Sequence, residues 1–158
     1  MQKICQKMQN AAHCAGFGIA CAATGAIQAC LDISVKYAQE RHQFKKPIGS
    51  FQLIQEKIAD MVVDLEASRW IAYRLAYLND KNVPVAKETS IAKYHNMEAM
   101  ARAARAAVEI HGAYGLSDEY PLERMFRDAM APIISGGPAN VHTLILGRLA
   151  LGIDAVSR

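Results

Sequence analysis

The chain has 158 residues, of which 52% are hydrophobic and 21% charged, and its formal net charge is +3. A chain of this length buries roughly 70% of the surface that its unfolded form exposes, so composition excludes a disordered chain. No run of five or six like charges occurs, which excludes a basic nucleic-acid-binding arm and a polybasic membrane patch. The 27 alanines favour helix, and Val, Ile and Thr do not alternate as they do in strands. We therefore predict one all-α domain over residues 1–158.

The first predicted helix runs from about Lys3 to Glu40. It contains no charged residue between Met8 and Leu31, and a segment of that length could span a bilayer. However, polar residues and three glycines lie among its many alanines, which makes it less apolar than a membrane span or a secretory signal. We interpret it as a small-residue helix packed inside a bundle, with a membrane span or a signal as the alternative.

The cysteines and histidines give no metal or disulfide pattern. No Cys-x-x-Cys pair occurs, and the spacings place no two thiols close enough along a helix for a disulfide. The histidines are never within four residues of one another, so no metal site is predicted. We expect reduced, buried thiols in a cytoplasmic protein. The residues concerned are Cys5, Cys14, Cys21 and Cys30, and His13, His42, His95, His111 and His142.

The second predicted helix follows a basic, turn-rich loop, residues 41–49, and Ser50 is its expected N-cap. Its apolar residues recur at steps of three and four, which predicts one buried stripe. Charged residues of this helix lie mostly off the stripe and are expected to be solvated. The stripe consists of Phe51, Ile54, Ile58, Met61, Leu65, Ala72 and Leu75.

Prolines and glycines bound the remaining predicted helices. A third helix is expected from about Val85 to His111, ended by Gly112 and Gly115. A short fourth helix begins near Pro121, and a last one begins at residues 137–138, with proline in its first turn. All five prolines are expected between helices. Because short loops join long helices, we predict an antiparallel up-down bundle of four main helices plus a short extra one.

No motif of a zinc hydrolase, serine hydrolase, P-loop or Rossmann protein occurs. From the residue pattern alone, the chain is a soluble helical bundle, and a bundle supports many functions.

Several segments, in order and spacing, resemble the acyl-CoA dehydrogenase family. The first is Tyr37 to Ile48, Tyr-Ala-Gln-Glu-Arg-His-Gln-Phe-Lys-Lys-Pro-Ile, continued by Phe51-Gln52. Further matches are Ala59-Asp60-Met61, His111 to Gly115, Glu119-Tyr120-Pro121 and Arg127-Asp128. The tail, Asn140 to Arg148, looks most like the glutaryl-CoA dehydrogenase branch. The resemblance covers essentially the whole chain and identifies it as the family's C-terminal helical domain.

The resemblance implies an oxidoreductase that acts on the α,β C–C bond of an acyl-CoA. In the family, FAD lies between an N-terminal helical domain, a middle β domain and this C-terminal domain, and it also touches a neighbouring subunit. The first two domains are absent from this chain, so we expect it to be inactive alone. The implied partners are an acyl-CoA substrate, further copies or a separate partner chain, and electron-transfer flavoprotein; no nucleic acid and no membrane span are expected.

The resemblance also implies which residues touch FAD. One group of residues lies at the diphosphate of FAD, and a second lies near its adenosine end. A guanidinium in the first group suits bidentate hydrogen bonds to phosphate. The implied residues are Arg41, Gln43, Phe44 and Gln52 at the diphosphate, Glu109, Gly112 and Ala113 near the adenosine, and Asn140.

The chain departs from the family where a carboxylate takes the α-proton of the acyl-CoA. The usual Glu of a Tyr-Glu-Gly-Thr string aligns with Gly136, and the alternative position on the first helix is Ala15, followed by Gly16. No catalytic residue is therefore predicted. Lys45, Glu109, Ala113 and Pro138 also replace the family's Gly, Gln, Gly and Thr.

These departures leave alternatives open. The base could come from the absent domains, or the chain could be a non-catalytic helical subunit that serves assembly. A third reading is an enoyl-CoA reductase with its proton donor elsewhere.

Overall fold

The computed structural model describes the backbone of residues 2–155 and the side chains of residues 16–155. Three long helices are formed by α1 (Gln2–Glu40), α2 (Gln52–Asp80) and α3 (Ala86–His111). Two shorter ones, α4 (Leu122–Ile134) and α5 (Ala139–Leu151), have 13 residues each. The prediction of an all-α domain is confirmed.

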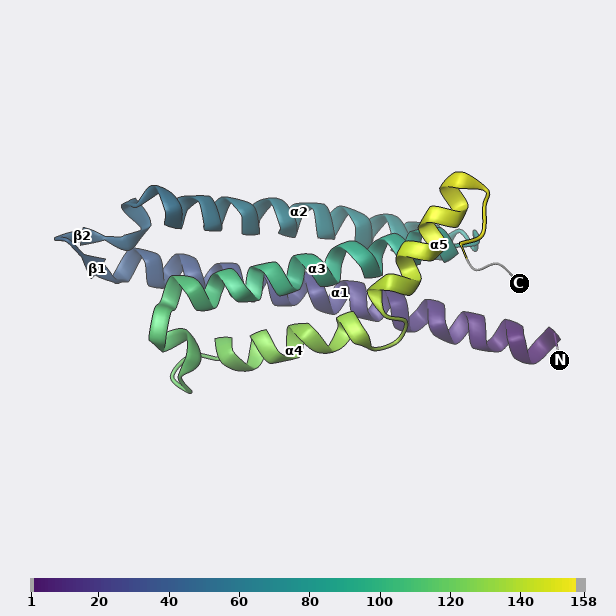
Figure 1. The fold of residues 1–158 in the computed structure, drawn as a ribbon, viewed down its shortest axis with the longest axis horizontal. Helices are drawn as coiled ribbons and strands as arrows, with labels where there is room; N and C mark the ends of the chain where they lie inside the picture. Colours follow the sequence, from purple (N-terminus) through teal and green to yellow (C-terminus); the bar gives the residue numbers. More distant parts are fainter. Residues whose placement is uncertain (1, 156–158) are drawn as a thin grey trace.

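The helices α1 to α4 lie along the long axis of the molecule and alternate in direction (Figure 1). The last helix, α5, crosses the others near one end of the molecule instead of extending alongside them. At the opposite end, α1 and α2 are joined by a hairpin of β1 (His42–Gln43) and β2 (Lys46–Pro47) and a 3₁₀ turn, η1 (Ile48–Ser50). A second 3₁₀ turn, η2 (Gly112–Leu116), follows α3.

The central element is α3, which contacts α1, α2, α4 and α5. Small side chains on its buried face let the neighbouring helices approach closely. The buried alanines of α3 are Ala92, Ala99, Ala103, Ala104 and Ala107. The predicted stripe of α2 also faces this core: four of its seven residues are buried and the other three pack partly buried against it.

The side chain of Asn96 ties the three long helices together in the interior. It is fully buried on α3, and its amide nitrogen donates to the carbonyl oxygens of Ala20 on α1, at 3.3 Å, and Ser68 on α2, at 3.1 Å. Both acceptor residues are small and completely buried. This one amide therefore fixes the relative position of α1, α2 and α3 at the same level of the bundle.

Three expectations about helix ends were wrong. Ser50 is no N-cap: α2 begins at Gln52 after an uncapped Phe51, and the Ser50 hydroxyl donates to the Pro47 carbonyl oxygen at 2.8 Å. Pro132 lies inside α4, in a helix that continues for only two further residues. Pro138 is the N-cap of α5 and not part of its first turn.

The expectation of buried thiols holds for one of the two cysteines whose side chains are described. Cys30 is buried, and its burial raises the pKa of the thiol to about 12. Cys21 is exposed, because it lies on the outer face of α1, so the expectation is wrong there. Cys5 and Cys14 lie outside the described side chains.

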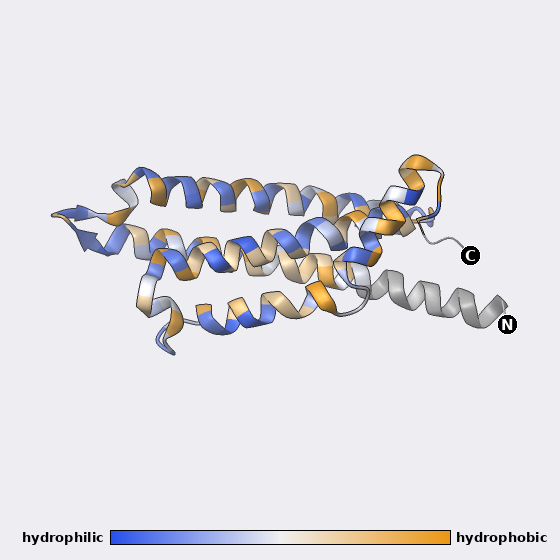
Figure 2. Ribbon diagram, in the orientation of Figure 1, coloured by the Kyte–Doolittle hydropathy of each residue, from blue (hydrophilic) through white to orange (hydrophobic). Residues whose placement is uncertain are grey.

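Among the described residues, one helical segment, Gly16–Glu40, is long and apolar enough to cross a membrane by length and composition. A third of its most apolar stretch is buried in the protein, where α1 packs against α2 and α3. The interpretation as a core helix accounts for this burial. Figure 2 shows hydrophilic and hydrophobic residues alternating along α2 and α3, as expected for helices with one buried face.

We expect Asn96→Leu to lower the free energy of unfolding by about 2 kcal/mol, because two buried hydrogen bonds are lost. Denaturant unfolding followed by circular dichroism measures the change. Tyr94→Leu, two residues away on the exposed side of α3, is the matched control and should change stability by less than about 0.5 kcal/mol. Equal stability of the two variants would contradict the bridging role of Asn96.

Candidate functional site

The hairpin between α1 and α2 is tied to the end of α1 by one backbone hydrogen bond and closed at its base by another. The Arg41 amide donates to the Tyr37 carbonyl oxygen at 2.8 Å, and the Ile48 amide donates to the Arg41 carbonyl oxygen at 2.8 Å. Between the paired strands, Phe44 and Lys45 form a two-residue turn with φ of 52° and 64°. This is the left-handed region, which two-residue hairpins require and which Gly adopts best.

The hairpin presents positive charge and an aromatic ring to solvent. Phe44 is 86% exposed at the tip. In the described part of the chain, Arg41, Lys45 and Lys46 form no ion pair, and the Lys46 ammonium lies 4.2 Å from the centre of the Phe51 ring. Exposed cations beside an uncovered aromatic ring suit an anionic ligand with an aromatic group.

An aromatic cluster joins the hairpin end of α1 to the end of α3. The rings of Tyr37 and His111 stack with their centres 4.1 Å apart, and Tyr120 packs edge-on against both. His111 is buried with Nδ1 2.8 Å from the Ala107 carbonyl oxygen, and burial lowers the pKa of its imidazole. A shallow cavity of about 360 Å³ lies beside the cluster, lined by Tyr37, Glu40, Arg41, Tyr114, Glu119 and Tyr120.

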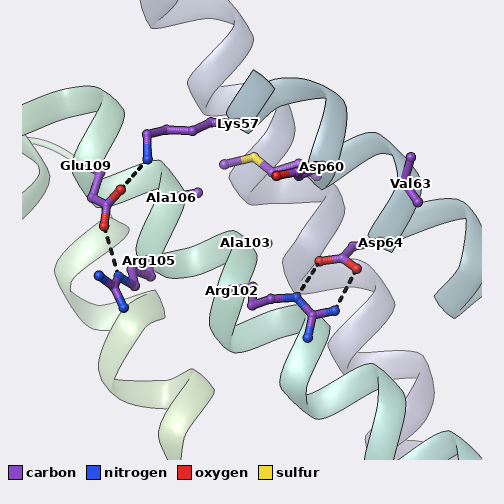
Figure 3. A pocket seen from close by; sticks show the side chains of 10 residues that line it. Lys57, Asp60, Val63, Asp64, Arg102, Ala103, Arg105, Ala106 and Glu109 are labelled. Carbon is purple, nitrogen blue, oxygen red and sulfur yellow. Dashed lines mark hydrogen bonds and ion pairs between the residues drawn. The ribbon is translucent and has the colours of Figure 1, made fainter. Parts of the chain in front are cut away.

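Glu109 is the centre of an ion-pair network between α2 and α3 (Figure 3). Lys57 reaches across from α2 to one carboxylate oxygen, and the Arg105 Nε–H donates to the other at 2.9 Å. The hydrogen bonds from Lys57 and then Arg105 lower the pKa of Glu109. Two cations therefore surround one anion, and the network carries a net charge of +1.

The network lines one end of a groove of about 540 Å³ between α2 and α3. A second ion pair lies further along the groove, where Arg102 binds Asp64 through two hydrogen bonds of 2.7 and 3.1 Å. Asp64 was expected to be an ordinary solvated charge, but its side chain is only 15% exposed and it holds α3 against α2.

The residues that the sequence assigned to FAD fall into two groups. Those on the hairpin, at the start of α2 and in η2 lie at one end of the molecule, and all of them are exposed. Asn140 is exposed in the first turn of α5, away from the hairpin end. The loop that leads into α5 lies on Lys93, 18 residues before His111, which is about 27 Å along α3 from the hairpin end. No single contact surface unites the two groups in one chain.

The family resemblance aligns two positions of this chain with the base, Gly136 and Ala15. Gly136 lies exposed in the loop between α4 and α5 with φ of 60°. Ala15 lies outside the described side chains. Within residues 16–155, no group of three His, Cys, Asp or Glu side chains is arranged to hold a metal ion.

Sequence reasoning missed Lys57 and Arg105, the partners of Glu109, and the buried Lys93. Arg105 lies four residues before Glu109, a spacing that indicates a helical ion pair. Lys93 interrupts the buried face of α3, where it falls four residues before Met97. No local sequence signal identifies Lys57, which is 52 residues from Glu109.

The comparisons with known proteins concern the family and the fold of the chain. The model of the family described as "Acyl-CoA dehydrogenase, C-terminal domain" matches residues 7–151. Glutaryl-CoA dehydrogenase of Desulfococcus multivorans is 42% identical over 135 residues, which are 85% of this chain and 35% of that protein. Caffeyl-CoA reductase-Etf complex subunit CarC of Acetobacterium woodii is 40% identical over 85% of this chain and 35% of its own length.

A solved structure of glutaryl-CoA dehydrogenase from Mycobacterium smegmatis in complex with FADH2 superimposes with a TM-score of 0.87. It is 29% identical, and the match covers 90% of this chain and 37% of that one. This chain thus spans about a third of the length of the relatives that it matches. It belongs to the acyl-CoA dehydrogenase family, a family of FAD-dependent oxidoreductases that act on CH–CH groups, and corresponds to the family's C-terminal helical domain.

The hairpin turn predicts a stabilising substitution. Lys45→Gly should raise the free energy of unfolding by about 1 kcal/mol, because glycine adopts the left-handed conformation without the steric cost that lysine incurs. The control is Lys46→Gly, which removes the same charge from a strand position and should not stabilise. Denaturant titrations compare the two; equal effects would contradict strain at residue 45.

Proposed function

We propose that this chain is the FAD-contacting, C-terminal part of an acyl-CoA dehydrogenase-like flavoprotein, and that it is inactive as an isolated chain. The observation that carries the proposal is the hairpin, where Phe44 is exposed and Arg41 has no ion-pair partner among the described side chains. A guanidinium makes paired hydrogen bonds to phosphate oxygens, and an exposed ring at the turn gains by covering a flat cofactor.

The residues of this end suit a dinucleotide. Arg41 and the neighbouring lysines would hold the diphosphate, with Gln43 and Gln52 as additional donors. Gly112 and Ala113 carry little or no side chain, so a ligand can approach the backbone of η2 closely. Glu109 does not oppose an anion there, because Lys57 and Arg105 leave its network with a net positive charge. Bound FAD would supply the group that accepts or donates hydride.

The separation of the two groups of residues favours an oligomer. If one FAD needs both a hairpin and the start of α5, we expect two chains to supply them, because about 27 Å of α3 separates these elements in one chain. Exposed apolar side chains on the outer face of α2 support further burial in an assembly. They include Leu53, Val63, Trp70, Tyr73 and Tyr77. We also propose that α1 to α4 of each chain form an antiparallel four-helix bundle.

The substrate class is an acyl-CoA, and the proposal leaves the direction of reaction open. The curated relatives include a glutaryl-CoA dehydrogenase and a caffeyl-CoA reductase subunit at nearly equal identity. The name of the second relative includes Etf, which supports electron-transfer flavoprotein as a redox partner. We also propose that the protein is cytoplasmic, as the expectation of reduced cysteines predicts.

A chimaera tests the proposal. The region of D. multivorans glutaryl-CoA dehydrogenase that precedes its match to this chain is fused ahead of residue 1. We expect the chimaera to purify with the visible absorption band of flavin and the isolated chain to be colourless. Arg41→Ala should weaken FAD binding about tenfold, the effect of losing one charge-assisted contact.

The matched control is Arg74→Ala, an exposed arginine that pairs with Glu88 far from the hairpin. Its affinity for FAD should equal that of the parent chimaera. A folded chimaera without flavin overturns the proposal, and an equal loss for both arginine variants removes the assigned role of Arg41.

A second candidate function is a non-catalytic subunit that serves assembly. The exposed Gly136 favours it, because the position that carries the family's carboxylate has no side chain at all. A proton acceptor within hydrogen-bond reach of the substrate is a requirement of α-proton removal.

Substitution at residue 136 separates the two functions. In the flavin-loaded chimaera, the non-catalytic function predicts no oxidation of glutaryl-CoA with the native glycine and a measurable gain with Gly136→Glu. Gly136→Gln imposes the same left-handed backbone strain without a base and should gain nothing. Oxidation by the native glycine form would refute the non-catalytic function. The measurement is reduction of an artificial electron acceptor under saturating substrate.

A further inference from the structure

A buried lysine lies directly beneath the loop that contains Gly136. Lys93 is only 3% exposed on α3, and its ammonium donates to the carbonyl oxygens of Ser135 at 3.1 Å, Gly137 at 3.2 Å and Gly136. A lysine ammonium has three N–H donors. Three carbonyl oxygens therefore use all of them, and no proton is left to point toward a ligand.

The loop needs such a partner, because it joins two helices through unusual backbone conformations. Ser135 is the C-cap of α4, and the carbonyl oxygens that follow the end of a helix have no helical donors. Gly136 and Gly137 have φ of 60° and 95° before α5 starts at Ala139. A cation is also favoured at a helix C-terminus. Lys93 supplies both the donors and the charge.

His142 confines the same loop from the side of α5. It is buried, and a Cβ atom at position 137 would lie 3.0 Å from its Nε2 atom. Burial first, and then the charge of Lys93, lower the pKa of His142, so the imidazole beside Lys93 is neutral at pH 7. A side chain at 137 would therefore be crowded by His142 and strained by the backbone conformation.

The start of the described part of α1 packs against the same lysine. A Cβ atom at Gly16 would lie 3.9 Å from the Cδ atom of Lys93 and would overlap the methyl group of Thr89. Gly16 follows Ala15, the family's alternative base position. The loop with Gly136 and the helix segment at Gly16 thus border one buried side chain.

We propose that Lys93 is a positioning residue, which holds the backbone of residues 135–137 in place and so sets where residue 136 lies. It acts as neither proton donor nor base, since its donors all bind backbone oxygens. That residue 136 would face the acyl-CoA rests on the proposed function. That Lys93 holds the backbone of residues 135–137 does not depend on that function, so it is tested on the 158-residue chain without flavin.

Hydrogen exchange of backbone amides tests the proposal. In Lys93→Met, the amides of Ser135 and Val141, which donate to the carbonyl oxygens of Ala131 and Pro138, should exchange about tenfold faster relative to those of α2 than they do in the parent chain. Lys87→Met, an exposed lysine of the same helix, should leave this ratio unchanged. Lys93→Arg keeps the charge and donors, and its loop should exchange more slowly than that of Lys93→Met. An unchanged ratio in Lys93→Met, or a loss of protection spread evenly over α2 and the loop, overturns the proposal.

A second measurement applies if Lys93→Met does not fold. In the parent chain labelled at lysine, the Lys93 ammonium protons should exchange with water at least tenfold more slowly than those of Lys87, because all three are hydrogen-bonded and buried. In a chain that is also labelled with 13C at the backbone carbonyls, they should show couplings to the carbonyl carbons of residues 135–137. Exchange as fast as that of Lys87 overturns the proposal. Either outcome is independent of flavin binding by the chimaera.

Discussion

The buried amide of Asn96 is the contact around which the long helices are arranged. Its two hydrogen bonds reach the backbones of α1 and α2 from α3, at Ala20 and Ser68, both of which are completely buried. An unpaired amide in this interior would be costly, so the three helices are held in one register. That register positions the hairpin beside η2 at one end and the 135–137 loop above Lys93 at the other.

The two ends differ in the chemistry that they present. The hairpin end is exposed and carries free cations and an uncovered aromatic ring, with the Glu109 network adding a net positive charge nearby. At the α5 end the charged group is the buried Lys93, and its ammonium donates to backbone carbonyl oxygens. One end thus has the features of a surface for an anionic ligand, whereas the other has a rigidly held loop without a reactive side chain.

The loop at the α5 end contains residue 136, which the family resemblance aligns with the carboxylate that acts as the base. The loop that the resemblance aligns with the base is held by a buried histidine and a buried lysine, and two of its glycines have left-handed conformations. Residue 136 itself has no side chain. Under the proposed function, this loop would be held in place without carrying a proton acceptor of its own.

The sequence by itself determined the helical class, the boundaries of the long helices to within a few residues, and the family. These follow from local signals: alanine content, three- and four-residue apolar steps, and a dozen residues around Arg41. It misplaced Ser50 and Pro132, because capping and helix continuation depend on the neighbouring backbone. Only the tertiary structure decided the pairing of Glu109 with Lys57 and of Lys93 with residues 135–137. Those partners are more than 40 residues apart, and no periodicity along the chain encodes a contact made between helices.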